Sequence, residues 1–182
     1  TFENGGVSCT GPATPFEITV NPTAQVNPTV DMVVTDGDNV DIPFSTINTG
    51  GTSTYTWTNT DPTTGLTNTG SSDIGFTAVN TGTSPITTTV VVTPTFENGG
   101  NSNSGPTDTF IITVNPTAQI DPIDSLVFCD EDVVDPIVFT TQNTGGTTTY
   151  SWTNDNTSIG LAASGNGTVS AFTVLNSSNQ TQ

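Results

Sequence analysis

Short runs in which apolar and polar residues alternate recur along the whole chain, separated by glycine, proline and asparagine. Within them, Tyr55 and Trp57 lie two residues apart, and Phe110, Ile112 and Val114 keep the same spacing. A period of two is typical of β-strands with one buried face, and Gly, Pro and Asn favour the turns between them. The pattern predicts an all-β protein, with strands that include residues 42–45, 55–57, 76–78, 86–92 and 110–114.

Several phrases of the sequence occur twice in the same order. TFENGG and VNPTAQ return after 94 residues, at 1–6 and 95–100 and at 20–25 and 114–119. NTGG and YTWTN/YSWTN return after 95 residues, at 48–51 and 143–146 and at 55–59 and 150–154. A period of about 95 residues is the usual size of an immunoglobulin-like sandwich, so the repeats predict tandem β-sandwich domains.

The asparagine–proline pairs at 21–22 and 115–116 set the expected domain boundaries, because proline cannot donate a hydrogen bond to a β-ladder. Residues 1–22 are then the C-terminal hairpin of a preceding repeat, residues 23–116 are a complete repeat, and residues 117–182 are the N-terminal part of a following repeat. The short, proline-bounded linker 22–28 is expected to give a semi-rigid rod.

TFENGG lies where a repeat enters its final hairpin, and Asn4-Gly5 and Asn98-Gly99 favour a tight turn there. Two interpretations of the partial repeats at the ends remain open. Either the chain is an excerpt from a long tandem array, or residues 1–22 of a neighbouring chain complete residues 117–182 by β-augmentation.

The composition excludes several classes of function. The chain of 182 residues has no lysine, arginine or histidine and a formal net charge of -17. Neutralising nucleic-acid phosphates or anionic lipid headgroups requires basic side chains, so we expect no nucleic-acid partner and no electrostatic membrane attachment. The longest apolar run, Val90 to Val92, is too short for membrane insertion. A soluble, self-repelling acidic surface suits an extracellular location.

Catalysis is also not expected. Without histidine or lysine the chain lacks the usual general bases near neutral pH, and Ser-His-Asp or Cys-His arrangements are impossible. Paired carboxylates, as in glycosidases, are the remaining option, but the acidic residues lie mostly in expected turns. We predict no catalytic residue and no obligatory cofactor.

Two acidic loops occupy equivalent positions in the repeats. They contain Asp36, Asp38 and Asp41, and Asp130, Asp132 and Asp135. Alternating aspartates near a glycine can surround a calcium ion with oxygen ligands, although the spacing does not match an EF-hand loop. Two interpretations therefore stand side by side: solvated turn carboxylates, or calcium sites that stiffen the junction between domains.

Cys9 and Cys129 are the only cysteines. Alignment of the repeats places Cys9 opposite Asn103 and Cys129 opposite Thr35, so the complete repeat lacks both. We expect the disulfide partner of each cysteine to lie outside this chain. Under strand donation, Cys9 of one chain could instead pair with Cys129 of another.

The aromatic pairs Tyr55/Trp57 and Tyr150/Trp152 have two interpretations as well. A tryptophan on the third strand of a sandwich usually fills the core, and its tyrosine neighbour shares that face. The alternative is a platform on which sugars stack. We predict core positions for all four side chains.

The run YSWTNDNTSIGLAASGNG at 150–167, together with TPTFENGG leading into FEITVNP or FIITVNP, resembles the PKD-like repeats of Bacteroidota cell-surface adhesins, including the SprB-type gliding-motility adhesins. The resemblance covers essentially the whole chain. It implies immunoglobulin-like β-sandwiches in series, type IX secretion and display on the cell surface. In that phylum Asp124-Ser125-Leu126 also fits the short O-glycosylation pattern, which implicates Ser125.

These observations predict non-catalytic stalk repeats of a long secreted surface adhesin, with neighbouring repeats as partners and a surface ligand that the sequence does not name. One alternative is a self-assembling extracellular fibre or sheath subunit, joined head to tail by strand donation. Another is a carbohydrate-binding module, which needs an exposed aromatic face.

Overall fold

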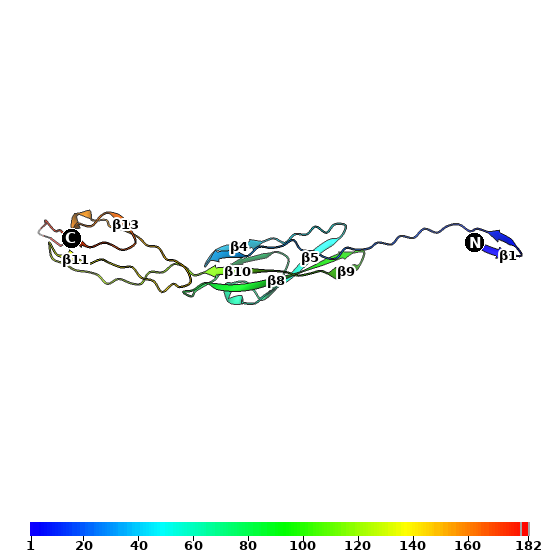
Figure 1. The fold of residues 1–182 in the computed structure, drawn as a ribbon, viewed down its shortest axis with the longest axis horizontal. Coiled ribbons are helices and arrows are strands. Elements are labelled where there is room, and N and C mark those ends of the chain that lie inside the picture. Colours follow the sequence, from blue (N-terminus) through cyan, green and yellow to red (C-terminus); the bar gives the residue numbers. More distant parts are fainter. Residues whose placement is uncertain (179, 182) are drawn as a thin grey trace.

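The computed structural model of the chain describes residues 1–178, 180 and 181. Its regular structure consists of β-strands and two 3₁₀ helices, with no α-helix among these residues, so the all-β prediction is confirmed. Figure 1 shows an elongated chain. A hairpin and an extended segment (residues 1–22, the N-terminal segment) lead into the central part (23–116), and the C-terminal part (117–182) lies at the opposite end.

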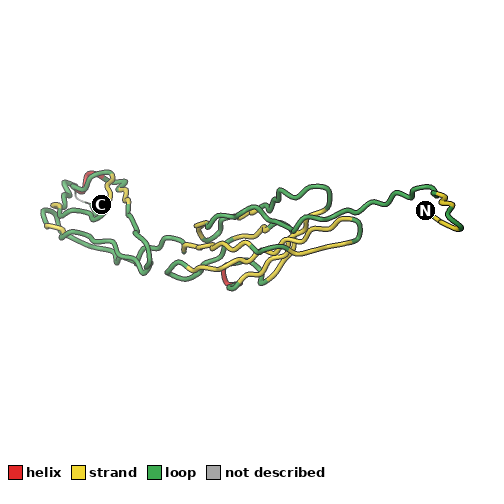
Figure 2. Tube along the Cα trace, turned by 45° about the vertical axis from the view of Figure 1, so that its right-hand side comes forward, coloured by secondary structure: helices red, strands yellow, loops and turns green. Residues whose placement is uncertain are grey.

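The elements follow one another along the chain in this order: β1 (Phe2–Asn4), β2 (Val7–Cys9), β3 (Met32–Thr35), β4 (Asn39–Ile42), β5 (Thr52–Asn59), η1 (Pro62–Thr64), β6 (Thr69–Ser71), β7 (Ile74–Thr77), β8 (Ile86–Asn98), β9 (Asn101–Ser104), β10 (Asp108–Asn115), β11 (Val133–Val134), β12 (Ser151–Thr153), η2 (Thr157–Ile159), β13 (Ser164–Asn166) and β14 (Phe172–Thr173). Strands are concentrated in the central part, whereas loops dominate the C-terminal part (Figure 2).

Two sheets face each other in the central part. The larger has the strand order β3-β10-β8-β5-β6, with β9 also paired to β8, and the smaller consists of β4 and β7. All pairs are antiparallel except β3 with β10, which run parallel with Ile112 opposite Met32. β3 and β10, the first and the last strand of this sheet along the chain, therefore lie side by side and run in the same direction.

β8 is the longest strand and the centre of the larger sheet. Its first half pairs with β10, its second half with β9, and residues 90–97 pair with β5. Pro94 breaks the pairing of β8 on neither edge. Tyr55, its partner on β5, accepts a hydrogen bond from the Ser72 N–H, so its carbonyl does not need an N–H from Pro94. On the other edge Gly105, in the bulge between β9 and β10, donates its N–H to the Pro94 carbonyl at 3.1 Å.

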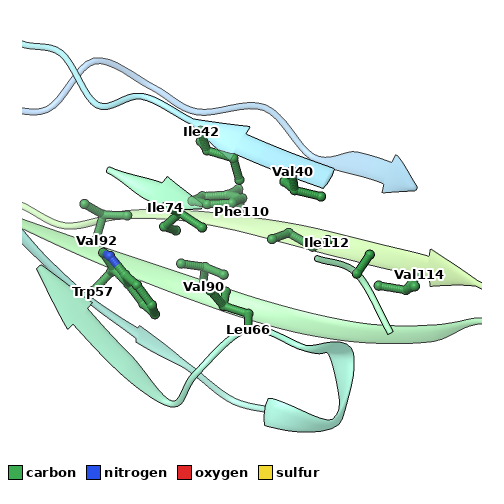
Figure 3. Packing of buried hydrophobic residues seen from close by; sticks show 11 residues of the cluster. Val40, Ile42, Trp57, Leu66, Ile74, Val90, Val92, Phe110, Ile112 and Val114 are labelled. Carbon is green, nitrogen blue, oxygen red and sulfur yellow. The ribbon is translucent and has the colours of Figure 1, made fainter. Parts of the chain in front are cut away.

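The core lies between the two sheets. Alternate side chains of β8 and β10 point inward and meet those of β4 and β7 (Figure 3). The residues of this core cluster are Val40, Ile42, Trp57, Leu66, Ile74, Ala78, Val90, Val92, Phe110, Ile112 and Val114. The period-two pattern in the sequence is thus the alternation between this core and the solvent.

The two copies of TFENGG form the same hairpin. Gly5 and Gly6 have φ values of 58° and 80°, and Gly99 and Gly100 have 61° and 78°. Two consecutive residues with positive φ define a type I′ turn, which suits the twist of antiparallel strands. The turn therefore lies one residue later than the predicted Asn-Gly pairs, because each asparagine is the last paired residue of its strand.

The C-terminal part reproduces half of the central arrangement. β11 pairs with β14 as β4 pairs with β7, and β12 pairs with β13 as β5 pairs with β6. Trp152 lies across from Gly165, as Trp57 lies across from Gly70. Among the described residues of this part, no strand corresponds to β3, β8, β9 or β10.

Identical phrases consequently have opposite environments. Phe96 in the second TFENGG is completely buried, whereas Phe2 in the first is 74% exposed. Phe96 packs its ring over Gly51, where an added Cβ would lie 2.5 Å from the ring. Sequence alone assigns the two phenylalanines the same role, but among the described residues only Phe96 lies in a core.

This contrast predicts different costs for the same substitution. Phe96→Ala is expected to lower the free energy of unfolding of the central part by about 3–5 kcal/mol, because it empties a buried ring site. Phe2→Ala is expected to change it by less than about 0.5 kcal/mol. Urea denaturation followed by Trp57 fluorescence, in a Trp152→Phe background, measures both. Equal effects of the two substitutions would contradict the fold assigned to residues 95–98.

Candidate functional site at the junction between the parts

The site begins where β10 ends. Pro116 follows Asn115, and the chain then crosses to the C-terminal part through residues 115–119, here called linker 2. Proline has no N–H and a fixed φ, so it ends strand pairing and restricts the path of the linker. Asn143 from the C-terminal part and Asp36 from the central part bond polar groups of linker 2.

Asn143 is the central side chain of this junction. Its Oδ1 accepts a hydrogen bond from the Gln119 N–H at 2.7 Å, and its Nδ2 donates to the Thr117 carbonyl at 3.3 Å. The same Nδ2 lies 3.5 Å from the carbonyl of Thr83 in the central part, and the Thr144 N–H donates to that carbonyl at 2.8 Å. One amide therefore connects the linker, the C-terminal part and the central part.

Thr141 orients the Asn143 side chain. The Thr141 hydroxyl donates to Asn143 Oδ1 at 3.0 Å and accepts the Asn143 N–H at 3.1 Å. Next to it, Gly145 has a φ of 76° and lies against Pro85, where an added Cβ would be 2.8 Å from the proline Cδ. The NTGG phrase thus places a polar amide and a close backbone approach at the same contact.

The preceding linker, residues 21–25 (linker 1), is bonded in the same way. Asn48 accepts from the Gln25 N–H at 2.7 Å and donates to the Thr23 carbonyl at 3.0 Å, as Asn143 does one repeat later. Thr46 contacts Asn48 as Thr141 contacts Asn143. The second copy of NTGG therefore repeats a structural role as well as a sequence.

Linker 1 also contacts the β8–β9 hairpin. The amides of Asn21 and Asn98 bond each other at 3.0 Å, and Asn21 Nδ2 donates to the Asn98 carbonyl at 3.0 Å. Asn103 accepts from the Ala24 N–H at 2.9 Å and donates to the Pro22 carbonyl at 3.1 Å. TFENGG accordingly ends at the point where the chain enters the central part.

Asp36 closes linker 2 from the central side. Its Oδ1 accepts the Asn80 N–H at 2.8 Å, and its Oδ2 accepts the Thr117 hydroxyl at 3.1 Å. Asp38 accepts the Thr35 N–H at 2.8 Å, while Asp41 is exposed on β4. In the C-terminal part, Asp130 and Asp132 accept the N–H groups of Asn176 and Cys129 at 2.7 Å each, and Asp135 is exposed.

These carboxylates do not converge. Within the part of the chain that the structure describes, no three acidic or cysteine side chains are grouped closely enough to hold a metal ion. In both loops, carboxylates accept hydrogen bonds from backbone N–H groups instead, and such bonds are charge-assisted. Asp36, Asp38, Asp130 and Asp132 each have a backbone N–H donor.

The predicted aromatic residues lie against the core. Trp57 is 7% exposed and donates its Nε1–H to the Ser72 carbonyl at 3.2 Å, so it cannot stack on a sugar. Tyr55 is half-buried beside Phe44, with ring centroids 5.5 Å apart. Burial raises the pKa of the Tyr55 hydroxyl, the Asp73 carboxylate raises it further, and a hydrogen bond with Thr46 offsets part of the rise.

The C-terminal aromatic pair has positions equivalent to those of Tyr55 and Trp57, but Trp152 is less buried than Trp57. Tyr150 and Trp152 are half-buried, and the ring centroids of Tyr150 and Phe139 are 5.7 Å apart. Trp152 Nε1 is buried and has no hydrogen-bond partner. Gly167 stands where the central part has Ser72, and its N–H donates to the Tyr150 carbonyl.

Cys9 and Cys129 are both exposed free thiols, one in the N-terminal segment and one in the C-terminal part. Ser125 is exposed. No helix in the described part of the chain is long and apolar enough to cross a membrane. Neither a scan against protein-family models nor a search of the curated proteins finds a match to this chain.

Sequence reasoning missed the asparagines of the junctions, of which Asn48 and Asn143 are the clearest. The signal was present, since NTGG and VNPTAQ are among the longest exact repeats. They marked the period of the repeat, and in the structure Asn48 and Asn143 of NTGG bond backbone groups of VNPTAQ.

Asp36 gives a test that separates backbone bonding from calcium binding. Asp36→Ala is expected to lower the stability of the central part by about 1–2 kcal/mol, because two hydrogen bonds to a charged acceptor are lost at a half-exposed site. Asp36→Asn keeps an acceptor oxygen and is expected to lose less than half as much. Both effects should be the same in calcium and in chelator, measured by urea denaturation. A melting temperature that calcium raises in the wild type but not in Asp36→Asn would assign the loop to calcium instead.

Proposed function

We propose that this chain forms non-catalytic stalk repeats of a long, secreted bacterial surface adhesin, in which β-sandwich modules follow one another in a semi-rigid series. The resemblance of its repeats to PKD-like adhesin repeats supports the proposal. The single observation that carries it is the junction of linker 2, where Asn143 bonds the linker and both parts at once.

The central part supports an immunoglobulin-like module. It has two facing sheets, a tryptophan in the core on the third strand, and a first strand that runs parallel to the last. Residues 23–116 form this unit, and the half-arrangement in the C-terminal part is that of a second unit of the same kind. Such modules contact mainly their neighbours, so their stabilities add along a series.

The mechanism proposed for the stalk is the transmission of tension. The chain enters the central part on the side of β3 and leaves it through β10, and these two strands are parallel. Pulling the two ends apart therefore shears the β3–β10 ladder, so that its hydrogen bonds are loaded together. Linker 2 follows β10 directly and passes the load to the next module.

The surface chemistry fits this role. Without basic residues the chain has no ion pairs between side chains to rearrange, and its net charge of -17 keeps neighbouring stalks apart at low ionic strength. On this proposal the protein is extracellular and surface-displayed, exported by type IX secretion, and its ligand binds elsewhere on the parent protein. Adhesion, with gliding motility as one setting, is the function that such a stalk serves.

The shape of the chain in solution tests the proposal. Small-angle scattering of dilute monomer is expected to give a rod-like distance distribution for the wild type. Asn143→Ala should shorten and broaden it, because the junction loses its bonds to Thr83, Thr117 and Gln119. The stability of the central part should change by less than about 0.5 kcal/mol.

Asn68→Ala is the matched control, since Asn68 is exposed and its side chain makes no junction contact. It should leave the distribution unchanged. A wild-type chain that is already as flexible as Asn143→Ala would contradict a semi-rigid stalk.

A further inference from the structure

Asparagine followed by glycine occurs three times in the chain, at Asn4-Gly5, Asn98-Gly99 and Asn166-Gly167. This pair is prone to deamidation, because glycine has no Cβ to hinder attack of its backbone nitrogen on the asparagine side chain. The pair at 98–99 lies at the end of β8 in the central part, and its asparagine contacts linker 1. A chemical change at this pair therefore acts on the entry to the central part.

The Asn98 side chain is part of the contact that holds linker 1. Its Nδ2 donates to Asn21 Oδ1 at 3.0 Å, and Asn21 Nδ2 donates to the Asn98 carbonyl at 3.0 Å. Asn98 is also the last paired residue of β8, opposite Asn101 of β9. One residue thus closes the β8–β9 hairpin and bonds the linker beside it.

The same hairpin supports the next residues of linker 1. Asn103 of β9 accepts the Ala24 N–H at 2.9 Å and donates to the Pro22 carbonyl at 3.1 Å. Ala24 is 1% exposed, and a Cβ added at Gly105 would lie 1.7 Å from its carbonyl oxygen. The position of Asn103 depends on the register that starts at Asn98, so the backbone at Asn98 also determines whether Ala24 keeps its acceptor.

We propose that Asn98 is a self-modification site whose reaction is controlled by linker 1. The Gly99 nitrogen attacks Asn98 Cγ and forms a C–N bond, the Cγ–Nδ2 bond breaks, and Nδ2 takes the proton that the Gly99 nitrogen loses and leaves as ammonia. The product is a cyclic succinimide. Water then opens the ring on one side to give aspartate or on the other to give isoaspartate, whose main chain runs through the side-chain carbons.

Linker 1 controls the reaction through the leaving group. Ring closure requires the Asn98 side chain to turn towards Gly99 and Nδ2 to depart, so the bond between Nδ2 and Asn21 must break first. The Gly99 N–H lies in the turn, outside the paired residues of β8 and β9, so the hairpin does not have to open. A docked linker therefore slows the reaction, and a released linker permits it.

Both products weaken the contact with linker 1. Aspartate has no N–H to donate to Asn21 Oδ1, and a chain without basic residues offers its charge no cation. Isoaspartate also lengthens the main chain by a methylene group at the last pair of β8 and β9, which shifts Asn103 relative to Ala24. In the proposed stalk, a linker released by tension would stay loose, but the modification itself does not rest on that function.

Peptide mapping by mass spectrometry tests the site in a chain with Asn4→Gln and Asn166→Gln, where Asn98-Gly99 is the one Asn-Gly pair left. Chymotrypsin produces the peptides, since the chain has no lysine or arginine for trypsin. At mildly alkaline pH, Asn98 is expected to deamidate about fivefold faster after Asn21→Ala, the factor that loss of a hydrogen bond of about 1 kcal/mol gives. Methylation by an isoaspartyl methyltransferase identifies the isoaspartate product.

Asn68→Ala is the matched control, since the exposed Asn68 side chain makes no junction contact, and it should leave the rate unchanged. Equal rates with and without Asn21→Ala would overturn the control by linker 1. An Asn98 that stays intact in both chains would overturn the site itself.

Hydrogen exchange followed by NMR measures the effect on linker 1. The Ala24 N–H is expected to exchange about fivefold to tenfold faster in aged than in fresh protein, since one or two hydrogen bonds are lost. Asn98→Gln cannot form the succinimide, so its exchange at Ala24 should not change with age. Unchanged exchange in a chain deamidated at Asn98 would refute the effect on the linker. These failures leave the stalk proposal intact, because its test is the junction at Asn143.

Discussion

β8 is the element on which the rest of the fold depends, because it pairs along both edges and its alternate side chains close the core. Only 31% of the residues are hydrophobic, so no short strand of this chain buries much on its own. In the central part, β8 provides β5, β9 and β10 with a common partner, and β5 and β10 are eight residues long. The C-terminal part has the same early strands but no described counterpart of β8, and there the strands are only two or three residues long. Sheet order in this protein is therefore cooperative across the sheet and not a local property of the sequence.

The absence of cations imposes a second constraint. A carboxylate in this chain has no lysine, arginine or histidine to pair with, so backbone N–H groups and hydroxyls are its donors. The aspartates that accept backbone N–H groups include Asp31, Asp36, Asp38, Asp61, Asp73 and Asp108. At Asp61, the hydroxyl and the N–H of Thr63 lower the pKa of the carboxyl, because hydrogen bonds donated to the ionised form favour it. Aspartate here fixes loops and strand ends, which gives the acidic residues at turns a role as acceptors of backbone N–H groups.

The features that the sequence predicted are those with a local or periodic signal. The alternation around Trp57 and Ile112 identified strands, and the repeated TFENGG identified a hairpin, with an error of one residue in its turn. The parallel pairing of β3 with β10 was not predictable, because its partners are about 80 residues apart and nothing in the short run of residues 32–35 specifies direction. The junction bonds were missed for the same reason: Asn21 and Asn98 are 77 residues apart, and asparagine has no periodic signature. Loop chemistry that joins distant segments needs the fold before it can be interpreted.

The junctions and the core use different chemistry, and this difference determines the overall shape. A hydrophobic contact between the parts would gain stability by enlarging its area and would fold them onto each other. Asn48, Asn143 and Asp36 instead satisfy specific backbone groups at fixed distances, and such bonds contribute only when their geometry is met. A linker bonded in this way keeps its direction while burying little apolar surface. Linker 2 continues directly from β10, and the Asn143 bonds to Thr117 and Gln119 therefore fix the chain at the point where it leaves the last strand of the central part.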